Sequence, residues 1–271
     1  FLPETPSITE FTTNKTMGQD CDIMVAKHGI SRTDQDKLAI ISHDLAEKAW
    51  EDGHHNKEVI PVQIPPKFKF IHKDNGIRPG SKIEKLAKLR PVFDKKHGTL
   101  NAANSSFLTD GSAVVLLMTE SKAKELGLTP KAEIIDYSFT GQRLEDELLL
   151  GPAFAMSKAL DNANLKLEDM DVFEIHEAFA GQVLANIKCL DDKDFCKERL
   201  KKDKTVGKIE MNKVNQWGGS LSIGHPFGAT GARLLNTAAN RLHEEGGKYA
   251  ILSACAAGAH GHAMIIKKYE N

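Results

Sequence analysis

One long amphipathic segment dominates the first half of the chain. Its apolar positions follow each other at intervals of three and four residues, and they are Leu38, Ile41, Leu45 and Ala49. This spacing predicts a helix over residues 31–53. Ser31 and Asp34 form a capping box at its start, and Gly53 suits its end.

Three other segments of the first half show different patterns. Residues 58–64 alternate between apolar and polar positions until Pro65 and Pro66, which predicts a strand. Residues 67–81 are basic and rich in turn formers, so we expect a loop. Residues 111–119 form a continuous apolar run, which predicts a buried strand.

Strand patterns and helix patterns alternate from about residue 131 onward. This alternation predicts a layered α/β fold. The charged insertion over residues 191–208 predicts a solvated surface. We expect strands over residues 131–140 and 171–175, helices over residues 151–164, 177–190 and 226–247, and a closing hairpin over residues 249–268.

Composition excludes several classes of protein. The chain has 271 residues, of which 41% are hydrophobic and 27% charged, and this is typical of a globular protein with a sizeable core. The net charge is −1, so no nucleic-acid partner is expected. The longest apolar runs are far shorter than the roughly 18 residues that a membrane span needs. Four cysteines without a CxxC spacing indicate a reducing compartment, and the lack of an initial methionine suggests that the N-terminus is absent from the sequence.

His176 and Glu177 lie where a predicted strand passes into a predicted helix. Rigid scaffolds commonly display reactive side chains at such ends of elements. The pair is not part of an HExxH zinc motif, because residue 180 is alanine. Two interpretations stay open from these residues alone: a catalytic pair, or a polar pair that caps the helix.

His225 lies in a glycine-rich segment, residues 215–233. A phosphate-binding loop is excluded, because both the lysine of a P-loop and the GxGxxG spacing are absent. Small residues at positions 228, 229, 231 and 232 predict a closely packed, buried helix after Pro226. His225 is therefore either a base at the mouth of that helix or a core histidine with satisfied hydrogen bonds.

Cys255 lies at the tip of the closing hairpin, and His260 and His262 follow on the returning strand. A metal site is not predicted, because no acidic or cysteine partner has matching spacing. A single cysteine in an apolar strand is usually an inert buried thiol. Cys255 is therefore either such a thiol or a catalytic group.

Taken together, these three segments resemble the thiolase family. The matching segments are residues 176–179, 218–233 and 255–258, with further support from residues 17–18, 31–43, 87–93 and 104–120. The resemblance implies the thiolase fold, a layered α/β/α/β/α arrangement of two similar halves, with the first part of the N-terminal half missing here. It also implies a loop domain over residues 1–95, the last strand and helix of the N-terminal domain over residues 96–128, and a C-terminal domain over residues 129–271.

The resemblance also implies an activity, that of an acetyl-CoA C-acyltransferase. Such an enzyme cleaves a 3-ketoacyl-CoA with CoA to acyl-CoA and acetyl-CoA in fatty-acid β-oxidation. His225 would take the proton of a nucleophilic cysteine, and His176 would help complete the oxyanion hole of the thioester. Cys255 would protonate the departing acetyl-CoA carbanion. The backbone N–H of Ala257, where the family usually has glycine, would serve a second oxyanion hole.

Other positions match the contacts that the family makes with CoA, which is a substrate; no cofactor and no metal are implied. These positions are Met17, Arg78, Ser106, Ala178 and Phe179. Thr16 replaces a histidine that the family often has. The nucleophilic cysteine of the family lies upstream of these motifs, and no residue of this chain matches it. We therefore expect the chain alone to be inactive.

His176 replaces the asparagine that most of the family has, and this narrows the resemblance to long-chain 3-ketoacyl-CoA thiolase subunits. These imply a thiolase homodimer, an α-subunit partner with hydratase and dehydrogenase activities, and peripheral membrane contact on the matrix side of the mitochondrial inner membrane. Two alternatives stay open. One is a nucleophile-free protein that binds acyl-CoA or forms a subunit interface. The other is a 3-ketoacyl synthase, against which the position of Cys255 argues.

Overall fold

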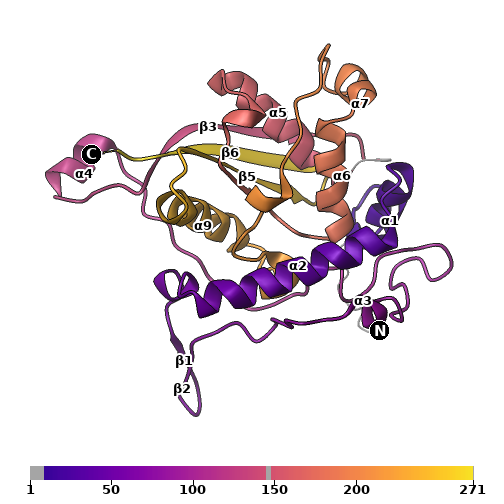
Figure 1. The fold of residues 1–271 in the computed structure, drawn as a ribbon, viewed down its shortest axis with the longest axis horizontal. Helices are drawn as coiled ribbons and strands as arrows, with labels where there is room; N and C mark the ends of the chain where they lie inside the picture. The colour runs from indigo at the N-terminus through magenta and orange to yellow at the C-terminus, as the bar shows by residue number, and fades with distance from the viewer. Residues whose placement is uncertain (1–8, 145–147, 271) are drawn as a thin grey trace.

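A four-stranded mixed sheet forms the centre of the molecule (Figure 1). The computed structural model describes residues 9–144 and 148–270. The strands β3 (Ala132–Gly141), β6 (His260–Lys268), β5 (Tyr249–Ala256) and β4 (Val172–Ile175) lie side by side in that order. β6 is antiparallel to both of its neighbours, whereas β4 is parallel to β5. The strands and the closing hairpin predicted for this half are confirmed.

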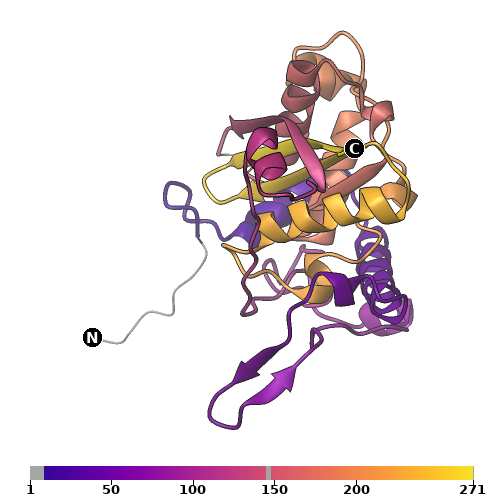
Figure 2. The same ribbon diagram turned by 90° about the vertical axis from the view of Figure 1, so that its left-hand side faces the viewer.

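Helices cover both faces of this sheet (Figure 2). α5 (Gly151–Ala163) packs on one face with α6 (Ala180–Leu190) beside it, and α9 (Thr230–Glu244) packs on the other face. The alternation of side chains along β5 separates two cores, because Ile251 joins the core under α5 and its two neighbours join the core under α9. The layered α/β architecture is therefore confirmed.

The two N-terminal helices pack against α6, and the second of them also packs against the glycine-rich segment. α1 (Met17–Lys27) contacts α6, and α2 (Arg32–Glu51) contacts α6 and the short helix α8 (Ser220–Ile223). α2 begins as predicted, since the hydroxyl of its N-cap Ser31 accepts a hydrogen bond from the backbone N–H of Asp34. Helix α2 thus holds the glycine-rich segment against the sheet domain.

A separate two-stranded hairpin projects beyond the end of α2 (Figures 1 and 2). β1 (Val62–Ile64) pairs with β2 (Lys69–Ile71) in antiparallel register. The strand predicted over residues 58–64 is confirmed in its second half. The loop predicted over residues 67–81 is wrong at its start, because the backbone of β1 offers hydrogen-bonding groups that β2 satisfies.

The buried strand predicted over residues 111–119 is wrong. These residues form no strand, and Val114, Leu116 and Leu117 are exposed at 84%, 75% and 64%. A buried strand needs neighbouring strands and a layer on each face, and the described residues offer this segment neither. The apolar run therefore lies extended along the surface before helix α4 (Glu120–Glu125).

Two helices begin later than their sequence patterns predicted. α6 begins at Ala180 instead of residue 177. α9 begins at Thr230 instead of residue 226, because a turn precedes it in which the N–H groups of Ala229 and Thr230 donate to the carbonyl of Pro226. His225 therefore lies one turn ahead of the helix and not at its first residue.

The close packing predicted around the small residues of this turn is also wrong at two positions. Gly228 and Gly231 are exposed, and a methyl group added at either would enter open space. Ala229, between them, is buried. The glycine face of this turn has no neighbour among the residues that the structure describes.

Short elements complete the described structure. The charged insertion over residues 191–208 lies at the surface, as predicted, although Phe195 and Cys196 within it are buried. In the described ranges, no helix combines the length and the hydrophobicity that a membrane crossing requires. The other short elements are η1 (His55–Lys57), α3 (Ile83–Leu86), η2 (Leu167–Asp169), α7 (Lys193–Glu198) and η3 (Met211–Lys213).

Candidate active site

His176 lies at the carboxyl end of β4. Its backbone N–H donates to the carbonyl of Ser253 at 2.8 Å, so the pairing of β4 with β5 continues through this residue. Its side chain is buried, and Nδ1 lies 2.9 Å from Oγ of Ser220 at the start of α8. Because β4 and β5 are parallel, the same register brings His176 to the sheet end where Cys255 lies.

Glu177 binds the glycine-rich loop and does not cap helix α6, which follows Glu177 in the sequence. Its buried carboxylate accepts hydrogen bonds from Oγ of Ser42 at 2.8 Å, Nδ2 of Asn215 at 2.8 Å and the backbone N–H of Leu221 at 3.1 Å. The N-cap of α6 is Phe179, which makes no side-chain cap. The interpretation of His176 and Glu177 as a helix cap is therefore wrong, since donors from other segments occupy the carboxylate.

Two glycines allow the loop to come this close. A methyl group at Gly219 would collide with the carboxylate of Glu177. Gly218 has a φ of +82° and packs against Ala46 of α2. The N–H of Gly219 also donates to Oγ of Ser42 at 3.2 Å. These contacts fix the loop between α2 and the end of β4.

His225 follows this loop, and one of its two ring nitrogens is bound by a neighbouring side chain. Its backbone N–H donates to the carbonyl of Phe107 at 3.0 Å. Nδ1 lies 2.6 Å from Oγ1 of Thr230, and that hydroxyl donates to the carbonyl of Pro226 at 3.2 Å. Because the hydroxyl has only one proton to give, it accepts from Nδ1–H of His225. Nε2 is then unprotonated and free to accept a proton, which is the state that a general base needs.

The two histidines contact each other. The centroids of the His176 and His225 rings are 4.0 Å apart, with 37° between the ring planes. Burial, together with the smaller effect of the nearby charge of Arg233, lowers the pKa of His225 to about 4. Burial, His225 and Arg233 hold the pKa of His176 well below its usual value. Both rings are therefore neutral at neutral pH.

Arg233 lies one turn beyond Thr230 on α9. Its Nε and Nη2 atoms are buried and have no hydrogen-bond partner among the described residues. An unpaired guanidinium beside neutral imidazoles is a fixed positive charge. The arrangement therefore suits the stabilisation of negative charge that develops next to the histidine pair.

Cys255 lies near the end of β5, opposite Gly261 of β6. Its side chain is half-buried, and burial raises its pKa to about 12, so the thiol keeps its proton at neutral pH. Ala257 is exposed in the turn that joins β5 to β6. His262 packs its ring against Phe139 with centroids 4.8 Å apart. A protonated thiol at this strand end has the form that a general acid needs.

The residues after His176 and Glu177 bind a segment from the first half of the chain. The N–H of Ser106 donates to the carbonyl of Ala178 at 2.9 Å. Phe179 forms a bridge with Ser105 and meets Phe93 edge to face, with ring centroids 5.7 Å apart. Met17 at the start of α1 packs against the same core. Four of the five positions predicted to contact CoA therefore lie in connected segments.

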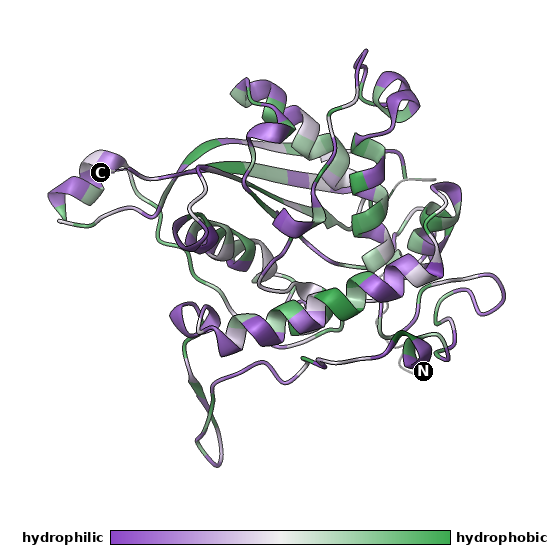
Figure 3. Cartoon of the chain, in the orientation of Figure 1, coloured by the Kyte–Doolittle hydropathy of each residue, from purple (hydrophilic) through white to green (hydrophobic). Residues whose placement is uncertain are grey.

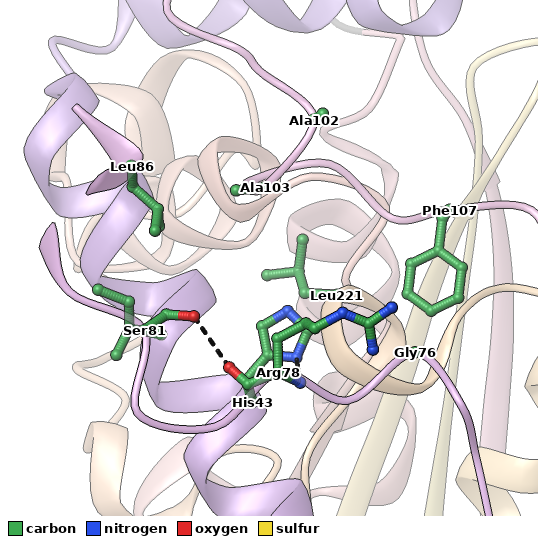
Figure 4. Close-up of a pocket in the computed structure, with 10 residues that line it drawn as sticks. His43, Gly76, Arg78, Ser81, Leu86, Ala102, Ala103, Phe107 and Leu221 are labelled. Atoms are coloured by element: carbon green, nitrogen blue, oxygen red, sulfur yellow. Dashed lines mark hydrogen bonds between the residues drawn. The ribbon is translucent and has the colours of Figure 1, made fainter. Parts of the chain in front are cut away.

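Arg78, the fifth position, lines a pocket of about 260 Å³ (Figure 4). Its backbone N–H donates to Nδ1 of His43 at 3.1 Å, and its guanidinium donates to the carbonyls of Asn75 and Ile77. Phe107 lines the same pocket, and its carbonyl holds His225. The pocket therefore adjoins the segment that carries the histidine.

Comparison with known proteins gives the family. The models of the N-terminal and C-terminal domains of thiolase match residues 2–121 and 128–268. The chain belongs to the thiolase family. Subunit beta of the mitochondrial trifunctional enzyme of Rattus norvegicus is 50% identical over 267 residues, which are 98% of this chain and 56% of that protein.

Solved thiolase structures have the same fold. The crystal structure of the Bacillus anthracis acetyl-CoA acetyltransferase matches with a TM-score of 0.87 and 37% identity, over 97% of this chain and 62% of that chain. The human mitochondrial 3-ketoacyl-CoA thiolase in complex with CoA matches with a TM-score of 0.83 and 32% identity, over 97% of this chain and 61% of that chain. The expected thiolase fold is confirmed, and the chain spans little more than half the length of the relatives that it matches.

The thiolase structure adds residues that the sequence did not single out. Ser220, Thr230 and Arg233 surround the two histidines, and Ser42 and Asn215 hold Glu177. Thr230 and Arg233 lie in the same motif as His225, so a hydroxyl five residues after that histidine was a usable signal. Ser42 gave none, because 135 residues separate it from Glu177. The catalytic and CoA-binding roles assigned to the predicted residues, and the domain boundaries inside the chain, stay predictions.

Proposed function

We propose that this chain supplies the base, the acid and the oxyanion donors of a 3-ketoacyl-CoA thiolase, an acetyl-CoA C-acyltransferase of fatty-acid β-oxidation. One observation carries the proposal. His225 has its Nδ1–H bound to Thr230, its ring against His176 and its Nε2 free. This is the arrangement of a base that receives a thiol proton beside a ready donor for an oxyanion.

The reaction follows in two stages. Nε2 of His225 accepts the proton of a cysteine thiol, and that sulfur bonds to the keto carbon of the substrate. The Cα–Cβ bond then breaks, and its electron pair stays on the Cα of acetyl-CoA, where the thiol of Cys255 supplies a proton. In the second stage Cys255 takes back a proton from the CoA thiol, and CoA sulfur displaces the cysteine, which recovers its own proton from His225.

The nucleophilic cysteine of this proposal comes from a part of the protein outside these 271 residues. Burial raises the pKa of Cys21 well above its usual value and that of Cys189 to about 12. The thiol of Cys196 is also buried, and it donates to backbone carbonyls near Cys189. Buried protonated thiols are poor nucleophiles, so none of these three suits the first stage.

The substrates of the proposed enzyme are CoA and acyl-CoA, without a cofactor or a metal. The human relative that binds CoA supports this choice. We assign the CoA contacts to the pocket beside Arg78 and to the connected positions Met17, Ser106, Ala178 and Phe179. Ala257 keeps the backbone N–H of its position, so it serves the second oxyanion hole despite its methyl group.

The similarity to trifunctional enzyme subunit beta suggests the partners and the location. We propose a mitochondrial protein on the matrix side of the inner membrane that forms a thiolase homodimer and works beside an α-subunit with hydratase and dehydrogenase activities. Pull-down of an endogenous α-subunit from mitochondria, with size measurement of the complex, tests this assignment. A mitochondrial protein that purifies without a second copy of itself and without an α-subunit would contradict this assignment.

Two half-reactions separate the roles of His225 and Cys255. Acylation of the nucleophile by a thionitrobenzoate thioester, whose leaving thiolate needs no proton, requires the base but not the acid, whereas cleavage of 3-ketoacyl-CoA needs both. In the protein that carries this chain together with its nucleophile, Cys255→Ala should lower acetyl-CoA release about 10³-fold and keep acylation. His225→Ala should lower both, as followed by the mass of the acyl-enzyme. Equal loss of the two half-reactions in Cys255→Ala would contradict the assigned acid.

The 271-residue chain alone provides a second test. It should bind CoA without releasing acetyl-CoA, and Arg78→Ala should weaken that binding in calorimetry. Release of acetyl-CoA by the chain alone would contradict the proposal that the nucleophilic cysteine lies outside these residues. Acyl-CoA binding without turnover by the longer protein would instead favour a nucleophile-free binding protein.

A further inference from the structure

Ser220 begins the short helix α8 inside the glycine-rich segment. Its side chain is completely buried, and α8 packs against α2, whose middle part is apolar and green in Figure 3. Oγ of Ser220 lies 2.9 Å from Nδ1 of His176 and makes no other hydrogen bond with the described residues. A buried hydroxyl needs a nearby acceptor for its proton, and Nδ1 of His176 is the acceptor that this hydroxyl has.

The tautomer of His176 follows from this contact. If Nδ1 carried the proton and donated it to Oγ, the hydroxyl proton of Ser220 would have no acceptor among the described residues, which is costly in a buried site. If Nδ1 is unprotonated, it accepts from the hydroxyl and both groups are satisfied. Burial, His225 and Arg233 hold the pKa of His176 well below its usual value, so the ring carries a single proton at neutral pH. That proton is then on Nε2.

His225 has the opposite tautomer. The proton of its partner hydroxyl, on Thr230, goes to the carbonyl of Pro226, so Nδ1–H of His225 donates and Nε2 is unprotonated. Two hydroxyls of one glycine-rich segment thus fix two rings in opposite tautomers, with the ring centroids 4.0 Å apart. One ring presents an acceptor at Nε2, and the other presents a donor there. A base and an oxyanion donor need these two states.

We propose that Ser220 is a positioning residue, which holds His176 in the tautomer that donates Nε2–H to the oxyanion of the reaction. This inference rests on the proposed function. When the cysteine sulfur bonds to the keto carbon, the thiol proton moves to Nε2 of His225 and the electron pair of the C=O bond moves onto oxygen. His176 donates a hydrogen bond to that oxygen and keeps its own proton. The other tautomer would turn a lone pair toward the oxyanion and destabilise it.

Nitrogen NMR tests the tautomers directly, because protonated and unprotonated ring nitrogens resonate far apart. The longer protein, which contains this chain and the nucleophile, is labelled with isotope-enriched histidine. The signals of the two rings are assigned by their loss in His176→Gln and His225→Gln. At neutral pH we expect protonated Nε2 in His176 and protonated Nδ1 in His225. Ser220→Ala should shift His176 toward the form that is protonated at Nδ1.

Ser222 provides the matched control. Its buried hydroxyl lies on the same short helix and donates to the carbonyl of Gly219 at 2.9 Å, and its partners among the described residues include neither histidine. Ser222→Ala therefore removes a buried hydroxyl from α8 and should leave the tautomer of His176 unchanged. A general loosening of the helix would appear in both variants, so a shift confined to Ser220→Ala belongs to the hydrogen bond with His176.

Acylation kinetics test the consequence for the reaction. With the thionitrobenzoate thioester, Ser220→Ala should lower kcat about 10-fold and leave KM nearly unchanged, because the oxyanion exists only after the attack. In a His176→Gln background the same substitution should have no further effect, since Ser220 acts through the imidazole. A merely structural serine would lower the rate by the same factor in both backgrounds.

Three results would overturn the proposal: a protonated Nδ1 of His176 in the wild type, an unchanged tautomer in Ser220→Ala, or additive effects of Ser220→Ala and His176→Gln. The wild-type spectrum decides even where a variant fails to fold. Failure of the proposed function gives a different result, because the longer protein would then show the expected tautomers and form no acyl-enzyme. The opposite tautomer in a protein that does form the acyl-enzyme would contradict the role of Ser220 and leave the proposed function intact.

Discussion

Two similarly apolar sequences differ in burial: one lies buried in the sheet domain, and the other lies exposed in the segment before it. Ile251 and Ile265, on β5 and β6, are completely buried between paired strands and α5. Residues 111–119 are at least as apolar, yet Leu116 is 75% exposed and pairs with no strand of the described ranges. The difference lies in the neighbours that each run has and not in the runs themselves. Hydrophobicity shows that a segment must be covered, and the surrounding chain decides whether it is.

The largest effect should come from truncating one side chain in each region. Ile251→Ala leaves a cavity in the core under α5 and should lower the free energy of unfolding by about 3 kcal/mol. Leu116→Ala removes an already exposed side chain and should change it by less than about 0.5 kcal/mol. Urea unfolding followed by circular dichroism measures both. Similar losses for the two variants would show that residues 111–119 are covered in solution.

The glycine-rich motif contains the same contrast within ten residues. Gly219→Ala places a methyl group against the carboxylate of Glu177 and should cost about 2 kcal/mol of stability. Gly228→Ala places the same methyl group in open space and should stay within about 0.5 kcal/mol. Thermal unfolding of the two variants compares them. A costly Gly228→Ala in the longer protein, but not in this chain, would mean that its remaining part covers that face.

These contrasts explain which parts of the structure the sequence could predict. Period-two and helical patterns predicted every strand of the main sheet and the helices α2, α5, α6 and α9, but they missed α1, because residues 1–30 look irregular and polar in the sequence. They failed at residues 111–119 and at β2, where pairing depends on which neighbour is present. For the site, the order of motifs indicated His176, His225 and Cys255. The hydrogen bond from Ser42 to Glu177 could not be predicted from the sequence, because it depends on how α2 packs across the loop.

Thr230 should matter for chemistry more than for folding. Thr230→Val keeps the shape of the side chain and removes the hydroxyl that accepts Nδ1–H of His225. The ring then loses its fixed tautomer, and acylation should slow about 10-fold in the complete enzyme. Thr237→Val is the matched control, since Thr237 lies on the same helix and binds Glu58 instead. Single-turnover experiments measure the rates. Equal rates for both variants would show that Thr230 does not position the base His225.

The smallest expected effect is a change in the titration of His225. Its pKa is about 4 in the folded chain because of burial and Arg233, whereas an exposed histidine titrates near about 6.5. The unfolded chain therefore binds the proton first, so this group contributes stability above pH 6.5 that is lost as the pH falls toward 4. Arg233→Met should raise the pKa of His225 and narrow that window, whereas Arg233→Lys should keep it. Histidine proton resonances in NMR follow the midpoint directly. An unchanged midpoint in Arg233→Met would assign the low pKa to burial alone, and the packed end of the sheet would then tune its base without a fixed charge.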